Sequence, residues 1–103
     1  MTQAELKAQL DTSGLPIAYR EWPDKKAPPL PWAVYYHTTT APFAADGQIY
    51  CPLPRYRVEL YSRHKDPAAE AAMEAALASF IWDKAETDLP DEKMTMISYE
   101  FDI

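Results

Sequence analysis

Apolar and polar side chains alternate strictly over residues 55 to 61, which read RYRVELY. This two-residue period is typical of a strand with one buried face. We therefore expect the apolar side chains of the segment to face the core, and Arg55, Arg57 and Glu59 to face outward. The same period recurs over residues 32 to 40 and 94 to 103, where aromatic and β-branched residues favour strands.

Two other segments carry a helical period together with a start signal. Residues 2 to 5 read TQAE, which fits a capping box, and a short helix is predicted over residues 3 to 11. Asp66 and Pro67 are the residue types preferred at the N-cap and the first helical position. Apolar residues at helical spacing then continue as far as Phe80.

The remaining segments are shorter strands and connectors. Residues 15 to 22 are expected to form a short strand at a sheet edge, because prolines flank it. Residues 23 to 31 hold four prolines and form a stiff connector, and residues 41 to 48 form a projecting loop around an Asp-Gly turn. A short strand is expected over residues 81 to 86, followed by a polar turn over residues 88 to 93.

The predicted order is helix, three strands, helix, two strands, with no repeated strand-helix unit. This order favours an α+β fold with an antiparallel four- to five-stranded sheet and two helices packed on one face. A length of 103 residues suits a single domain over residues 1 to 103.

Charge and composition narrow the possible functions. The chain has 10 Lys+Arg and 16 Asp+Glu, a formal charge of -6, which argues against a surface that neutralises nucleic-acid phosphates. No secretory signal pattern and no apolar run of membrane-spanning length are apparent, so we expect a protein made in a cytoplasm without membrane contact.

Residues that carry chemistry are few and scattered. His37 and His64 fall in different strand regions, and a metal site needs further ligands beside them. Cys51, the single cysteine, has no basic cluster around it in the sequence. With 2 glycines, the chain has no phosphate-binding glycine loop. We therefore expect no catalytic, metal or cofactor site, and a protein that is not an enzyme.

Aromatic residues occupy both faces of the predicted strands, including Trp32, Tyr35 and Tyr36. One layer of helices covers one sheet face only. The other face is then either an ordinary amphipathic surface or an interface with another copy or an assembly partner, where tyrosine and tryptophan are enriched.

Several short segments stand out as motifs. Residues 14 to 19 read GLPIAY, residues 28 to 36 read PPLPWAVYY, and residues 45 to 50 read ADGQIY. Together with the RYRVELY strand and the KDP of residues 65 to 67, these motifs resemble a family of small tail-assembly proteins from long-tailed phages and prophages. Gly47 stands where the family commonly has Asn, and Trp32 stands where it commonly has Tyr or Phe.

The resemblance covers roughly residues 13 to 103 and implies a tail terminator or tail-completion protein. Such a protein caps the tail tube as a ring, generally of six copies, and forms part of the surface that joins the head. The implied partners are further copies of the chain, the major tail protein and head-tail connector proteins, and the implied location is the tail or neck of the virion.

Two alternatives remain open at this point. A neck or head-closure connector protein of the same assembly module has a similar size. A small α+β ligand-binding domain or enzyme that uses Cys51 or His37 in a pocket belongs to a different class.

A ring protein needs surfaces that fit other copies. The projecting loop and the outward side chains of the following strand are the expected interface, namely Phe43, Asp46, Gln48, Tyr50, Arg55, Arg57 and Glu59.

Overall fold

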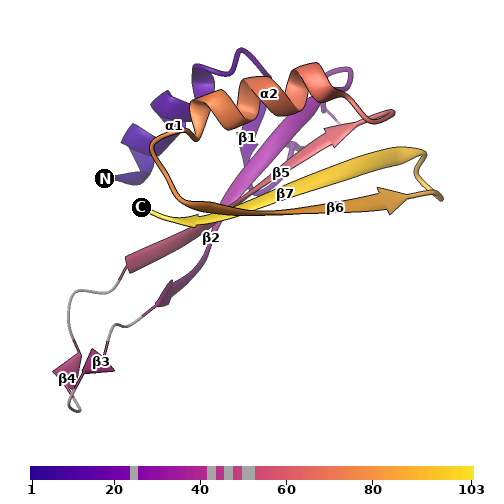
Figure 1. Ribbon diagram of the computed structural model, residues 1–103. Helices are drawn as coiled ribbons and strands as arrows, with labels where there is room; N and C mark the ends of the chain where they lie inside the picture. Colours follow the sequence, from indigo (N-terminus) through magenta and orange to yellow (C-terminus); the bar gives the residue numbers. More distant parts are fainter. Residues whose placement is uncertain (24–25, 42–43, 46–47, 50–52) are drawn as a thin grey trace.

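The computed structural model describes residues 1–23, 26–41, 44–45, 48–49 and 53–103, and for residues 39–41, 44–45, 48–49 and 53 it describes the backbone alone. The described elements are α1 (Gln3–Asp11), β1 (Ile17–Tyr19), β2 (Trp32–Ala41), β3 (Ala44–Ala45), β4 (Gln48–Ile49), β5 (Leu53–Ser62), α2 (Pro67–Ala76), β6 (Trp82–Leu89) and β7 (Met94–Asp102). Figure 1 shows the short β3–β4 pair beyond the end of the main sheet.

The main sheet has five strands in the order β1-β2-β5-β7-β6. The α+β class and the five strands of this sheet agree with the sequence prediction, but the sheet is mixed rather than purely antiparallel. The predicted element order was also incomplete, because the short strands β3 and β4 lie where a loop over residues 41 to 48 was expected. β1 runs parallel to β2, with Ile17 opposite Ala33, and the other neighbouring strands of the sheet are antiparallel. The connector over residues 20 to 31 explains the difference, since a link of about a dozen residues is long enough to return the chain to the same end of the sheet.

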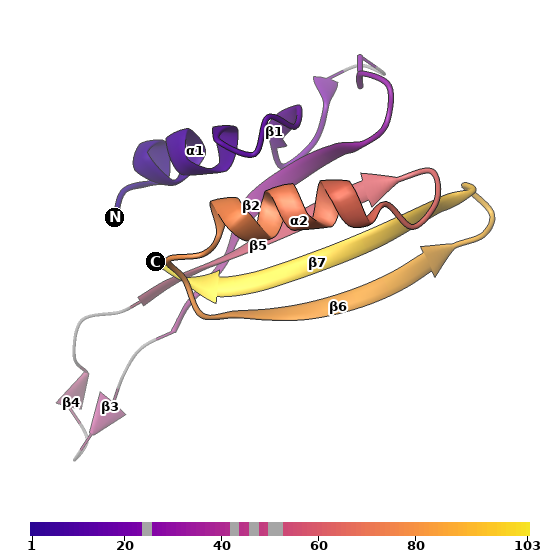
Figure 2. The same cartoon turned by 45° about the horizontal axis from the view of Figure 1, so that its top comes forward.

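Both helices lie on the same face of the sheet, as Figures 1 and 2 show. Leu6 and Leu10 of α1 and Met73 of α2 are fully buried there. The strands contribute the alternate set of side chains that the sequence pattern predicts, namely Tyr56, Val58, Leu60, Ile97, Tyr99 and Phe101. The core therefore occupies the space between one helix layer and one sheet face.

The helix boundaries follow the predicted capping signals. The hydroxyl of Thr2 accepts a 3.1 Å hydrogen bond from the backbone N–H of Glu5, whose carboxylate accepts one from the backbone N–H of Thr2. At α2 the carboxylate of Asp66 accepts from the backbone N–H of Ala69 at 3.1 Å. The N-cap side chains of both helices thus accept hydrogen bonds from backbone N–H groups that would otherwise have no partner.

The hairpin formed by β6 and β7 has strand boundaries that differ from those predicted. β6 continues to Leu89, which pairs with Met94, so the connecting turn is shorter than the expected residues 88 to 93. β6 also begins at Trp82, which leaves Ile81 outside the strand. Within the described residues, no helix is long and apolar enough to cross a membrane.

Candidate functional site: an open sheet face and its aromatic groove

The sheet face opposite the helices is called the open face below. Because side chains alternate along each strand, this face receives the set that points away from the core. Its main members are Trp32, Val34, Tyr36, Arg55, Arg57, Glu59, Tyr61, Asp83, Met96, Ser98, Glu100 and Asp102. Within the described residues, neither helix lies over it (Figure 2).

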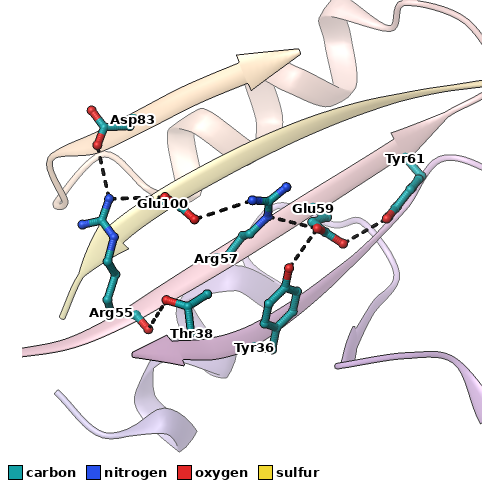
Figure 3. A network of polar contacts seen from close by, with 8 residues as sticks. All are labelled: Tyr36, Thr38, Arg55, Arg57, Glu59, Tyr61, Asp83 and Glu100. Atoms are coloured by element: carbon teal, nitrogen blue, oxygen red, sulfur yellow. Dashed lines mark hydrogen bonds and ion pairs between the residues drawn. The ribbon is translucent and has the colours of Figure 1, made fainter. Parts of the chain in front are cut away.

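Glu59 is the centre of a polar network on the open face, shown in Figure 3. Its carboxylate accepts hydrogen bonds of 2.9 Å from the hydroxyls of Tyr36 and Tyr61. It also accepts one of 2.9 Å from Nε of Arg57. With its side chain 15% exposed, Glu59 is a partly buried charge whose oxygens have three donors.

The same contacts change the pKa values of the two tyrosines. Burial, followed by the hydrogen bond to Glu59, raises the pKa of Tyr61 well above its usual range. Tyr36 has a raised pKa for the same two reasons, in the same order. Both phenols are therefore held as neutral donors, and their rings are fixed in place on the sheet surface.

Arg55 gathers a second group of carboxylates at the far end of the network (Figure 3). Its guanidinium lies 3.3 Å from Asp83, 3.4 Å from Glu100 and 3.3 Å from Asp102. Arg57 also reaches Glu100, at 3.6 Å. Three carboxylates thus surround Arg55, and of these only Glu100 also reaches Arg57, so this end of the open face carries an excess of negative charge.

An aromatic groove of about 320 Å³ opens at the opposite end of this face. It is lined by Arg20, Glu21, Trp22, Ala27, Trp32, Val34, Glu59 and Tyr61. The ring centroids of Trp22 and Trp32 are 6.0 Å apart with planes at 73°, and those of Trp32 and Tyr61 are 4.9 Å apart. Within the described chain, the buried indole Nε1 of Trp22 has no hydrogen-bond partner.

The groove has polar residues at its border that differ in charge. Arg20 and Glu21 are both exposed, whereas Glu59 lies deeper and is already bonded to the tyrosines and Arg57. Nε, Nη1 and Nη2 of Arg20 form no ion pair with any carboxylate of the described residues, and its Cζ lies 6.0 Å from the centroid of the Tyr19 ring. With respect to the described residues, Arg20 is therefore a cation without a carboxylate partner at the border of the groove.

The structure describes four of the seven predicted interface residues. Arg55, Arg57 and Glu59 face away from the helices as expected, although they are partly shielded by their contacts with one another. Gln48 lies in β4, where its backbone pairs with Ala45. The other three, Phe43, Asp46 and Tyr50, lie outside the described residues, so the structure provides no test of an interface there.

The groove itself was missed by the sequence prediction. Trp22 and Arg20 enter it from the connector between β1 and β2, which strand alternation does not describe. A tryptophan on either side of a proline-rich segment, here Trp22 and Trp32, is the signal that was available. In the structure these two rings lie edge to face at the groove, with centroids 6.0 Å apart.

The residues considered for chemistry are separated in the structure. His37 lies on the helix side of the sheet, where its ring packs edge-on against Tyr56 with centroids 5.3 Å apart. His64 is exposed in the link after β5, and Cys51 lies outside the described residues. Among the residues that the structure describes, no three His, Cys, Asp or Glu side chains are grouped to hold a metal ion.

The geometry fits a binding surface whose side chains are held in place before any partner arrives. No protein-family model and no curated protein matches the chain.

Proposed function

We propose that this chain is a virion assembly protein of the tail-terminator type, which forms a ring on the end of a tail tube and provides part of the head-joining surface. The sequence motifs support the family, and the structural observation that supports assembly is the one-sided covering of the sheet. Two helices protect one face, while the other presents ordered aromatic and charged side chains.

The open face has the composition of a protein interface. Its aromatic groups are Trp32, Tyr36 and Tyr61, and its arginines are paired rather than mobile. Tyrosine, tryptophan and arginine are enriched at such surfaces because they combine apolar area with directed hydrogen bonds. Side chains that are already fixed lose little conformational freedom when a partner binds.

The charge of the chain is compatible with this role. A ring at the end of a tube has DNA passing through its lumen, and clustered lysines and arginines would retain the phosphates. A formal charge of -6 avoids that retention. The partners in this proposal are further copies of the chain, the major tail protein and the head-tail connector proteins.

Deletion of the gene from the phage or prophage that carries it tests the proposal. We expect tails of uncontrolled length that fail to join heads, seen by electron microscopy, and restoration by the gene supplied on a plasmid. Normal, infectious particles from the deletion would contradict it. Tails of normal length that fail to join heads would instead indicate a neck or head-closure connector.

A further inference from the structure

Ile81 is the most exposed large apolar residue in the described part of the chain, with 95% of its surface accessible. It lies between the end of α2 and the first residue of β6, next to the half-buried Phe80. The residues that follow enter the ladder with β7, so the position of Ile81 is fixed by its neighbours. An isoleucine held outward on ordered backbone is suited to insert into an apolar hollow of another molecule.

The aromatic groove is such a hollow. Its volume of about 320 Å³ exceeds that of one branched aliphatic side chain, and its walls are Trp22, Trp32, Val34 and Tyr61. The strand residues of the groove are Trp32 and Val34 of β2 and Glu59 and Tyr61 of β5, whereas Ile81 precedes edge strand β6. Trp82, which follows Ile81, pairs with Phe101 and so lies level with Tyr56 of β5, toward the other end of that strand from Tyr61. Strand β7 also lies between β5 and β6, so Ile81 does not reach the groove of its own chain.

One charged residue beside each feature has the sign that would attract the other, namely Asp83 beside Ile81 and Arg20 beside the groove. Asp83 is two residues from Ile81, its side chain is 87% exposed, and it shares Arg55 with Glu100 and Asp102. The groove has both Arg20 and Glu21 at its border, and the carboxylate of Glu59, which also lines it, is already paired with Arg57. A second copy that presents Ile81 to the groove with Asp83 on the Arg20 side therefore brings a carboxylate toward the guanidinium of Arg20.

We propose that Ile81 of one copy seats in the aromatic groove of the next copy, with Asp83 facing Arg20 across the contact. A contact between two different surfaces joins copies head to tail, and such an arrangement closes into a ring when the rotation per copy permits. This inference identifies a copy-to-copy contact and rests on the proposed ring assembly.

Mixing two variants isolates a single contact. Ile81→Ser keeps the groove and removes the projection, whereas Arg20→Asp keeps the projection and alters the groove. We would label Ile81→Ser with ¹⁵N, add unlabelled Arg20→Asp up to about 1 mM, and follow the indole N–H signals of Trp22 and Trp32. Both signals should shift, and unlabelled Ile81→Ser added at the same concentration should leave them unchanged.

A charge exchange tests the ionic part of the contact. Labelled Arg20→Asp should bind unlabelled wild type about tenfold more weakly than labelled Ile81→Ser does. Unlabelled Asp83→Arg should restore the binding to labelled Arg20→Asp, because the two charges are then exchanged across the contact. Circular dichroism of each variant confirms that it is folded.

Two results would overturn the inference. One is the absence of indole shifts at about 1 mM partner, and the other is an equal shift with Ile81→Ser as the unlabelled partner. If either is found while gene deletion gives overlong tails, the ring proposal stands and this contact is removed. If the contact is confirmed and deletion gives normal particles, the copies associate but the tail role is wrong.

Discussion

The hydroxyl of Tyr99 donates a 2.9 Å hydrogen bond to the carboxylate of Glu74, which joins the interior strand β7 to helix α2. Tyr99 is fully buried, and its pKa lies well above the usual range, first because of burial and then because of the bond to Glu74. Lys84 on β6 lies 2.7 Å from the same carboxylate. The covered face of the sheet is thus held to its helix by directed polar contacts as well as by apolar packing.

Removal of that hydroxyl should destabilise the fold modestly. For Tyr99→Phe we expect the free energy of unfolding to fall by about 1 kcal/mol, because the ring still fills its space and Glu74 keeps Lys84. Urea denaturation followed by circular dichroism measures the change. Tyr19→Phe, at an exposed ring, is the matched control and should change the value by less than about 0.5 kcal/mol. Equal losses for the two variants would contradict this account of the bond.

Acid should weaken the attachment of α2. Burial raises the pKa of Glu70, but Lys84 and Lys65 outweigh it and leave that pKa below its ordinary value of 4.5. The pKa of Glu74 is lowered chiefly by Lys84. A carboxyl whose folded pKa is depressed contributes stability above its unfolded pKa and loses it as the pH falls through the folded pKa.

We therefore expect the free energy of unfolding to be steady near neutral pH and to fall once the pH passes below the ordinary glutamate pKa of 4.5. Glu70→Gln should unfold more easily at neutral pH and show a smaller loss in acid, since one of the titrating groups is absent. Urea denaturation at a series of pH values measures both effects. A pH dependence identical to that of the wild type would show that Glu70 is not responsible.

The buried face of each long strand was predictable, because successive side chains of a strand point to opposite faces of the sheet. The alternation over residues 55 to 61 assigned Tyr56, Val58 and Leu60 to the core, and the structure confirms it. The capping residues Thr2 and Asp66 were equally readable, since they bond to backbone groups within three residues.

The pairing of strands was not predictable in the same way. No residue of Ile17–Tyr19 encodes whether its neighbour runs parallel or antiparallel, because direction depends on the path of the chain over residues 20 to 31. The groove was missed for a related reason. Trp22 and Tyr61 are far apart in the sequence, and they line one groove because both rings pack against Trp32 of β2.

Docking of the first helix depends on its leucines. Leu10 is fully buried against the core, so Leu10→Ala should lower the free energy of unfolding by about 2 to 5 kcal/mol through lost apolar burial and a cavity. Ala8→Ser, at an exposed position of the same helix, should cost about 0.5 kcal/mol. Thermal unfolding measures both. If Leu10→Ala matched Ala8→Ser, the helix would contribute little to the folded state in solution.

Reversal of one charge on the open face should impair assembly without unfolding the chain. Arg57 lies between Glu59 and Glu100, so Arg57→Glu replaces two attractions by repulsion and disturbs the network that fixes Tyr36 and Tyr61. Because Arg57 is only partly buried and touches no core residue through these contacts, circular dichroism should still show a folded protein.

Complementation of the gene deletion measures the effect of that reversal. Plasmid-borne Arg57→Glu should restore plaque yield poorly, whereas Arg63→Glu, at an exposed position just beyond β5, should restore it like the wild type. The two variants make the same change in net charge, so a difference between them isolates the position on the open face. Full restoration by Arg57→Glu would mean that this part of the face makes no contact needed for assembly, and would direct attention to the groove and Ile81 instead.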